Sequence, residues 1–160
     1  MFNKREVIII SSDGSYNVYK SISNDPGDIK YYHSYYLKKY IDDNKINIGD
    51  IDINNITSTG PACEMLSKNG YSIIIIEGLF ILIYLPEIIT KEQSNFYYKN
   101  KMLFLGKSFY YSYIEDKKII YSKFDDNEKN SFKVKTFYNY IKENLENQKR
   151  GEENEHRKTI

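Results

Sequence analysis

Cys63 is the residue with the most distinctive chemistry, because it is the only cysteine and follows a run of small polar residues. The residues of that run are Thr57, Ser58, Thr59 and Gly60. Pro61 then marks the start of a short helix, and a helix N-terminus lowers the pKa of a thiol and binds anions. A nucleophile beside a phosphate-binding turn is one interpretation. We favour a buried core cysteine, because cysteines are among the most buried residues and no histidine can be placed beside this one.

The histidines and acidic pairs are the next candidates, as metal ligands or acid–base groups. His33 falls among the tyrosines of a predicted helix, and His156 lies near the C-terminus. With a single cysteine, the chain has too few nitrogen and sulfur ligands for an ordinary zinc site. The stretch 50–61 begins with the spacing of a calcium-binding EF-hand loop but lacks its Gly and its bidentate Glu. We expect no metal and no cofactor, and we interpret His33 as a packed residue.

Lysines alternate with aromatic residues through the region 107–142, which suggests a nucleic-acid surface. Lysines neutralise phosphates and tyrosines stack on unpaired bases. The candidate residues are Tyr111, Tyr113, Lys118, Lys123, Lys133 and Lys135. Acidic residues are mixed into the same region and the formal net charge is only +1, so a solvated mixed-charge surface is favoured. Nucleic-acid or nucleotide binding remains the alternative.

Exposed tyrosines offer an interpretation that needs no catalytic group. Two predicted helices place tyrosines beside a lysine on their outer sides: Tyr31, Tyr35 and Lys39 on the first, and Tyr97, Tyr98 and Lys101 on the other. Rigid amphipathic side chains of this kind anchor protein interfaces. The abundance of Tyr, Ile, Asn and Lys would also follow from AT-rich codons, so the placement of the tyrosines matters more than their number.

The stretch 71–85, YSIIIIEGLFILIYL, is the element that organises the chain. Two apolar runs joined at Glu77-Gly78 predict an antiparallel hairpin. A membrane helix would need about 20 apolar residues without a central carboxylate, so no membrane association is expected. Both faces of each strand are apolar, and both must therefore be covered. Helices are expected on one face, which leaves the other for a helix, a loop or a second copy.

The N-terminal part of the chain predicts another hairpin over 6–22, with a turn at 11–14. A helix follows, from a cap at Asp28 to about residue 41. The stretch 42–55 alternates isoleucine with polar residues, which favours an exposed edge strand or an extended loop.

The remaining elements follow from local start and stop residues. Pro and Gly bound a short helix over 61–69, and a capping box at 90–93 begins a helix over 91–105. A third hairpin over 109–124 precedes a last helix over about 131–148.

These elements predict a single α+β domain over 1–148 and a polar tail over 149–160. The domain is expected to have a largely antiparallel sheet of about six strands, built from three β-hairpin–helix units, with the helices mainly on one face. One cysteine fits a reducing cytosol, and the N-terminal apolar run is too short for a signal peptide. A cytoplasmic location is expected.

No catalytic constellation emerges, so we expect a non-catalytic protein-binding module. Its size and composition are similar to those of accessory proteins of phages and mobile elements, such as inhibitors of host defence systems or toxin-immunity proteins. It contains no motif that identifies a family. The expected partner is another protein, and a second copy on the uncovered sheet face is a further candidate. The alternatives are a nucleic-acid or nucleotide binder using 107–142 and a small enzyme using Cys63.

Overall fold

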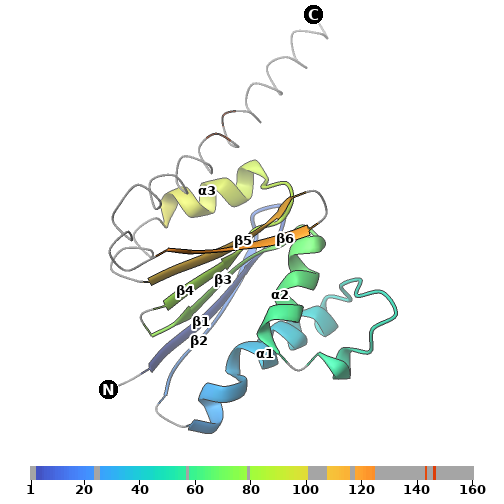
Figure 1. Ribbon diagram of the computed structural model, residues 1–160, viewed down its shortest axis with the longest axis vertical. Helices are drawn as coiled ribbons and strands as arrows, with labels where there is room; N and C mark the ends of the chain where they lie inside the picture. The colour runs from blue at the N-terminus through green and yellow to red at the C-terminus, as the bar shows by residue number, and fades with distance from the viewer. Residues whose placement is uncertain are drawn as a thin grey trace, which may run out of the picture.

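The computed structural model describes residues 3–23, 26–56, 58–78, 80–100, 108–115 and 118–124, together with Glu143 and Glu146. These residues form an α+β fold built around a four-stranded antiparallel sheet, with three α-helices packed on it (Figure 1). The predicted fold class is confirmed in this broad form. Among the described helices, none combines the length and the apolar character needed to cross a bilayer.

The centre of the sheet has the strand order β2-β1-β3-β4, and each neighbouring pair is antiparallel. Its strands are β1 (Asn3–Ile10), β2 (Tyr16–Ser23), β3 (Ser72–Glu77) and β4 (Phe80–Tyr84). The hairpins predicted over 6–22 and 71–85 are confirmed. The turn of the second one begins at Gly78, one position later than predicted, because Glu77 is still paired with Phe80. Gly78 has a φ of +57°, which a two-residue hairpin turn requires.

Beyond β4 the sheet continues with β5 (Ser108–Glu115) and β6 (Lys118–Phe124). β6 is antiparallel to β5, whereas β5 runs parallel to β4. This parallel pair is the exception, among the described strands, to the expected antiparallel pairing. It arises because the connection from β4 to β5 includes a helix, which returns the chain to the end of the sheet where β4 began. The helix predicted over 131–148 and the tail 149–160 lie outside the described residues, so the plan of three hairpin–helix units stays a prediction.

The helices are α1 (Pro26–Asp43), α2 (Thr59–Lys68) and α3 (Lys91–Lys99), and a 3-10 turn, η1, spans Ile53–Asn55. α1 begins two residues before the predicted cap at Asp28, because Pro26 suits the first helical position, where no N–H is needed. α3 begins with the predicted capping box. Oγ1 of Thr90 accepts a hydrogen bond from the Gln93 N–H (3.1 Å), and Oε1 of Gln93 accepts one from the Thr90 N–H (3.0 Å). The stretch 42–55 completes α1 and then forms a loop ending in η1, without the edge strand considered for it.

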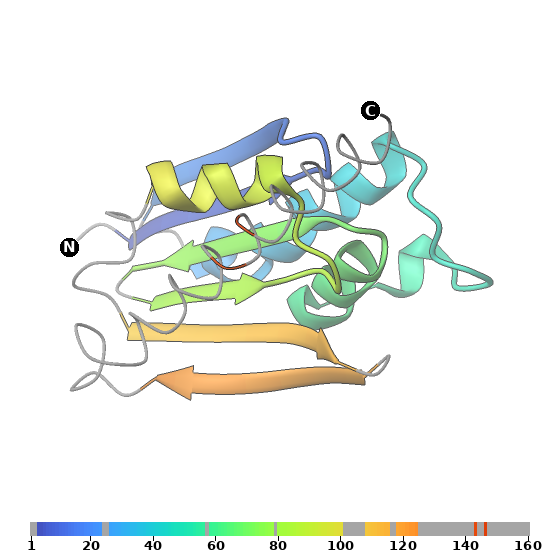
Figure 2. The same cartoon turned by 90° about the horizontal axis from the view of Figure 1, so that it is seen from above.

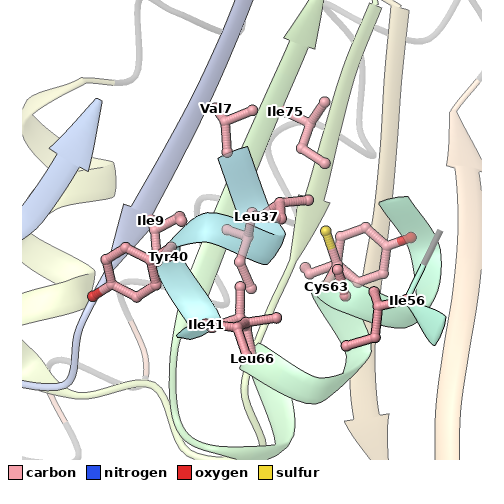
Figure 3. Packing of buried hydrophobic residues seen from close by; sticks show 12 residues of the cluster. Val7, Ile9, Leu37, Tyr40, Ile41, Ile56, Cys63, Leu66 and Ile75 are labelled. Atoms are coloured by element: carbon pink, nitrogen blue, oxygen red, sulfur yellow. The ribbon is translucent and has the colours of Figure 1, made fainter. Parts of the chain in front are cut away.

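The helices cover both faces of the sheet, with α1 and α2 on one face and α3 on the other (Figures 1 and 2). Alternate residues of the central strands therefore contribute to two separate cores. The core under α3 contains Ile8, Ile10, Ile74, Ile76, Ile81, Ile83, Leu85, Ile89 and Tyr97. The core under α1 and α2 contains Val7, Ile9, Leu37, Tyr40, Ile41, Ile56, Ala62, Cys63, Leu66, Ile73, Ile75 and Tyr84 (Figure 3).

The position of α3 corrects the expected placement of the helices. They do not lie mainly on one face, and the second face of β1, β3 and β4, for which a helix, a loop or a second copy was considered, is covered by α3 of the same chain rather than by a second copy. The reason is that Ile73 to Ile76 are apolar on both sides of β3, so leaving either face exposed would sacrifice about 25 cal/mol per Å² of apolar surface. The sequence also predicts burial of six apolar side chains, and this is confirmed for Ile75, Ile81 and Ile83. Of the other three, Phe96 is half-buried, and Phe137 and Ile141 lie outside the described part of the chain.

The start of α3 is held against two distant segments by side-chain hydrogen bonds. Gln93 is fully buried, and its Nε2 donates to the carbonyl oxygens of Ile10 (3.2 Å) and Gly70 (2.8 Å). Oγ1 of Thr90 donates to the carbonyl oxygen of Ser12 (2.8 Å), in the turn between β1 and β2. Gly14 of the same turn has a φ of +88°, and a Cβ there would lie only 2.7 Å from Cβ of Glu92. These contacts fix the position of the β1–β2 hairpin relative to α3.

Candidate functional site

One side of α1 packs on the sheet, and the other carries aromatic side chains to the surface. Over residues 33–43, where side chains of α1 are described, the buried ones are His33, Leu37, Tyr40 and Ile41. Their spacing places them on one side of a helix with 3.6 residues per turn. Tyr35 and Lys39, one turn apart, lie on the opposite side and are both exposed.

Four side chains of α1 and β2 form a contiguous patch that we name the tyrosine surface: Tyr19, Tyr35, Tyr36 and Lys39. The Tyr36 ring stacks on Tyr19, with centroids 4.7 Å apart and planes at 24°. The Tyr35 ring meets Tyr36 edge-on, with centroids 5.1 Å apart and planes at 87°. Tyr35 is 58% exposed, so the outermost ring of the stack is available to a partner. Each ring is held by its neighbour, which limits the side-chain entropy lost on binding.

The opposite face of β2 is also partly apolar and exposed. Tyr16 is 56% exposed and Val18 is 43% exposed, and both lie on the α3 side of the sheet. The ring of Tyr16 contacts Phe96 of α3 edge-on, with centroids 5.0 Å apart. Aromatic and apolar side chains therefore flank this strand on both faces.

The predicted interface residues of α3 are not a surface group. Tyr97 was expected on the outer side of its helix but is fully buried, because α3 packs on the second face of the sheet. Its hydroxyl forms a hydrogen bond with the Ser72 hydroxyl, and burial raises its pKa well above the usual range. Tyr98 is half-buried against the same core. Lys101 lies outside the described residues, and Tyr31, one turn before Tyr35 on α1, stays a prediction.

Cys63 lies in the core between α2 and the sheet, among Leu37, Leu66 and Ile75 (Figure 3). Its side chain is fully buried, and this burial raises the thiol pKa well above its ordinary value. A nucleophilic cysteine needs the opposite shift, because the thiolate is the reactive form. The placement agrees with the interpretation of Cys63 as a core residue. Of the residues before it, Ser58 occupies the N-cap position of α2 without a side-chain capping hydrogen bond, and Thr57 lies outside the described residues.

A charged cluster that sequence reasoning missed lies at one end of the sheet, beneath α1. Arg5 of β1 is fully buried and pairs in register with Glu77 of β3. Nε of Arg5 lies 4.0 Å from Oε1 of Glu77, and Nδ1 of His33 lies 3.4 Å from Oε2 of the same carboxylate. The sequence gives a partial signal for this pairing, since Lys4, Arg5 and Glu6 precede one apolar run and Glu77 follows another. The cluster compensates a buried guanidinium and links α1 to the sheet, a structural role.

The stability of the protein is expected to fall as the pH is lowered from about 7.5 to 5.5. Burial lowers the pKa of His33, and the Arg5 charge acts in the same direction, although the Glu77 carboxylate opposes them. The unfolded state, with a histidine pKa of about 6.5, then takes up a proton before the folded state does, and stability is lost below that pH. Thermal melts across this range measure the effect. A His33→Asn variant should show a flatter pH dependence than a His156→Asn control, and an unchanged or higher Tm of the wild type at pH 5.5 would contradict the assignment.

The candidates for nucleic-acid binding lie far from the tyrosine surface. β5 carries Tyr111 and Tyr113, and β6 carries Lys118 and Lys123, at the end of the sheet opposite β2 (Figure 2). Lys133 and Lys135 lie outside the described residues, so this alternative stays a prediction.

The acidic loop before α2 has a local structural explanation. Oδ1 of Asp52 accepts a hydrogen bond from the Asn54 N–H (3.0 Å) and so caps η1. In the part of the chain that the structure describes, no three His, Cys, Asp or Glu side chains are arranged to share a metal ion. A shallow pocket of about 310 Å³ lies between this loop and α2. Its lining mixes Ile48, Ile51 and Met65 with Lys68, without a buried polar group to orient a ligand.

Comparisons with protein-family models, with curated proteins and with solved structures gave no match to this chain, so its function must be inferred from its own residues.

Proposed function

We propose that this protein is a non-catalytic protein-binding module and that its partner docks on the tyrosine surface. The observation that supports this most is the ordered stack of Tyr19, Tyr36 and Tyr35, whose outermost ring is 58% exposed. Tyrosine supplies a large contact area with few rotatable bonds, and for this reason it is enriched among the residues that dominate binding energy.

The charged residues near the stack are of both signs, so the proposed docking surface has little net charge. Burial raises the pKa of the Tyr19 hydroxyl, and Asp43 raises it further while Lys39 lowers it, so both charges lie near the ring. Opposite charges at the edge of an aromatic centre select the orientation of a partner more than they add affinity. Binding is therefore expected to depend only weakly on salt, unlike binding to a nucleic-acid backbone.

We infer the class of partner from the size and composition of the chain. A small α+β chain, with a composition of the kind that AT-rich codons produce and with its one cysteine in the core, fits a cytoplasmic accessory protein of a phage or mobile element. Inhibition of a host defence protein, or immunity to a toxin, needs a stable surface and no catalytic group. The whole chain is proposed to form three β-hairpin–helix units around a sheet of six strands, with the last helix over about 131–148.

The test is capture of a partner by the tagged full chain from the lysate of a low-GC bacterial host, with and without nuclease. A stoichiometric protein should be retained after nuclease treatment and at about 0.5 M salt. Truncating Tyr35 to Ala should weaken its binding about 30-fold, the effect of losing about 2 kcal/mol at a central interface tyrosine.

The matched control is Ile88→Ala, which removes a side chain that is 73% exposed in the loop before α3. This variant should bind like the wild type. The free energy of unfolding of both variants should stay within about 0.5 kcal/mol of the wild-type value. Equal binding by Tyr35→Ala and wild type would contradict the proposed surface. Loss of all captured protein on nuclease treatment would instead favour the region 107–142.

A further inference from the structure

β2 ends the sheet, and no described strand lies beyond it (Figure 2). Its pairing with β1 continues without a bulge over all eight residues, and it contains no proline. Lys20 is its single charged residue, directly opposite Glu6 of β1. Edge strands in natural proteins are usually short, bulged or charged, because an open edge is a template for pairing with another strand. β2 has little of this protection.

The alternation of hydrogen bonds along the hairpin identifies the backbone groups that face the open edge. The Ser11 N–H donates to the Ser15 carbonyl oxygen (2.8 Å), which makes this a hydrogen-bonded position at the end of the ladder. Because hydrogen-bonded and non-hydrogen-bonded pairs alternate in antiparallel sheets, the N–H and C=O groups of Tyr16, Val18, Lys20 and Ile22 point away from β1. These four residues therefore offer donors and acceptors to an incoming strand.

Val18 also ends a row of apolar side chains that crosses the sheet. Ile83 pairs with Ile74, Ile74 with Ile8, and Ile8 with Val18, all on the face covered by α3. The three isoleucines are at most 4% exposed, whereas Val18 is 43% exposed. The core of this face thus reaches the edge of the sheet and is left uncovered on one side of Val18.

We propose that a second copy of this chain covers this edge, by antiparallel pairing of the two β2 strands about a two-fold axis at Val18. In this register Val18 lies beside Val18 of the second copy, and the two apolar rows join into one. Tyr16 lies beside the second copy's Lys20, which suits an ammonium group against an aromatic ring. Tyr16, Val18 and Lys20 then each meet an outward-facing residue of the second copy, as an isologous interface requires.

The neighbouring two-fold registers fit less well. An axis at Tyr19 would place Val18 opposite Lys20, and an axis at Lys20 would place the two lysines opposite each other. Of these three registers, only the axis at Val18 places Val18 opposite Val18 and gives each Lys20 an aromatic partner. A two-fold axis perpendicular to the joined sheet also leaves both copies of α1 on the same face, so the dimer presents two tyrosine surfaces on one side.

The test uses the full chain and the new disulfide that this register predicts. Cα atoms of a hydrogen-bonded antiparallel pair lie about 5.5 Å apart, which is within disulfide range. A Val18→Cys variant should therefore form a covalent dimer on mild oxidation, and Cys63 will not interfere because it is fully buried. Lys20→Cys is the matched control on the same face. Its two thiols would be offset by four residues, about 13 Å along the strand, and should not cross-link.

The mass of the unmodified protein gives the second measurement. Sedimentation equilibrium at about 100 μM should give twice the 19.0 kDa of the chain. Val18→Lys should raise the dimer dissociation constant about tenfold or more by placing like charges opposite each other, while Val18→Thr keeps the dimer. A chain that stays monomeric, or cross-linking of Lys20→Cys as fast as Val18→Cys, would overturn the proposal. The result is independent of the proposed function, because a monomer can still capture a partner and a dimer can form without one.

Discussion

A Gln93→Glu variant is expected to be destabilised by about 3 kcal/mol or more at neutral pH, although the two side chains have nearly the same shape. Nε2 of Gln93 donates to two carbonyl oxygens, those of Ile10 and Gly70, in a fully buried position. Glutamate replaces this donor with an acceptor, so the change leaves two buried carbonyl oxygens without their donor and adds a charge facing them. The bond from the Thr90 N–H alone cannot compensate for this.

The destabilisation of Gln93→Glu should decrease as the pH is lowered. The buried carboxyl will have a raised pKa, and once protonated it regains one donor. Urea unfolding at pH 7 and pH 5 measures both effects, with Glu92→Gln as the control for the opposite exchange at the exposed neighbour. Glu92→Gln should change stability by no more than about 0.5 kcal/mol. A Gln93→Glu protein with wild-type stability at pH 7 would show that α3 does not hold the two carbonyl groups in this way.

An Ile81→Asp variant is expected not to fold. Ile81 is fully buried on β4, paired with Ile76, in the core under α3. The change removes a buried side chain worth about 2–5 kcal/mol and places an unpaired carboxylate in an apolar core, at a cost of several kcal/mol more. A total of this size reaches the 5–15 kcal/mol by which domains are normally stable.

The control for Ile81→Asp is the same substitution at Ile88, which is 73% exposed. That variant should remain folded, within about 0.5 kcal/mol of the wild type. Far-UV circular dichroism and thermal melting distinguish the two outcomes. A soluble Ile81→Asp protein with wild-type melting would contradict the placement of β4 between the two cores.

The elements that the sequence predicts correctly depend on local physical chemistry. The central hairpin has apolar runs rich in isoleucine on either side of a glycine, α2 has a proline near its start and Gly70 just past its end, and α3 has a capping box whose two hydrogen bonds form as expected. The misassigned buried side of α1 also has a local cause. The helical period predicts an apolar stripe on α1 through Ile29, Tyr32, Tyr36 and Tyr40. Tyr40 is buried, but Tyr36 is only half-buried, because tyrosine tolerates such a position beside a second ring, and the side chains buried with Tyr40 are those of His33, Leu37 and Ile41.

The features that could not be predicted depend on contacts between distant segments. The burial of Tyr97 follows from α3 crossing to the second face of the sheet, and its own helix does not encode that choice. The proximity of Arg5, Glu77 and His33 depends on the register between β1 and β3 and on the packing of α1. At the candidate site, Tyr35 and Lys39 were identified from the helical period, but Tyr19 was not, because only the fold places β2 beside α1.

The position of β1 between β2 and β3 has a consequence for synthesis on the ribosome. The hairpin of β1 and β2 is made first, but β1 is not paired on its second edge until β3 has emerged more than 60 residues later. The start of α3, which donates to the Ser12 and Ile10 carbonyl groups 78 and 83 residues before it, follows later still. During this interval Val7 to Ile10 expose apolar side chains on both faces and an open strand edge. The nascent chain is therefore expected to depend on ribosome-associated chaperones until residue 99 has left the exit tunnel.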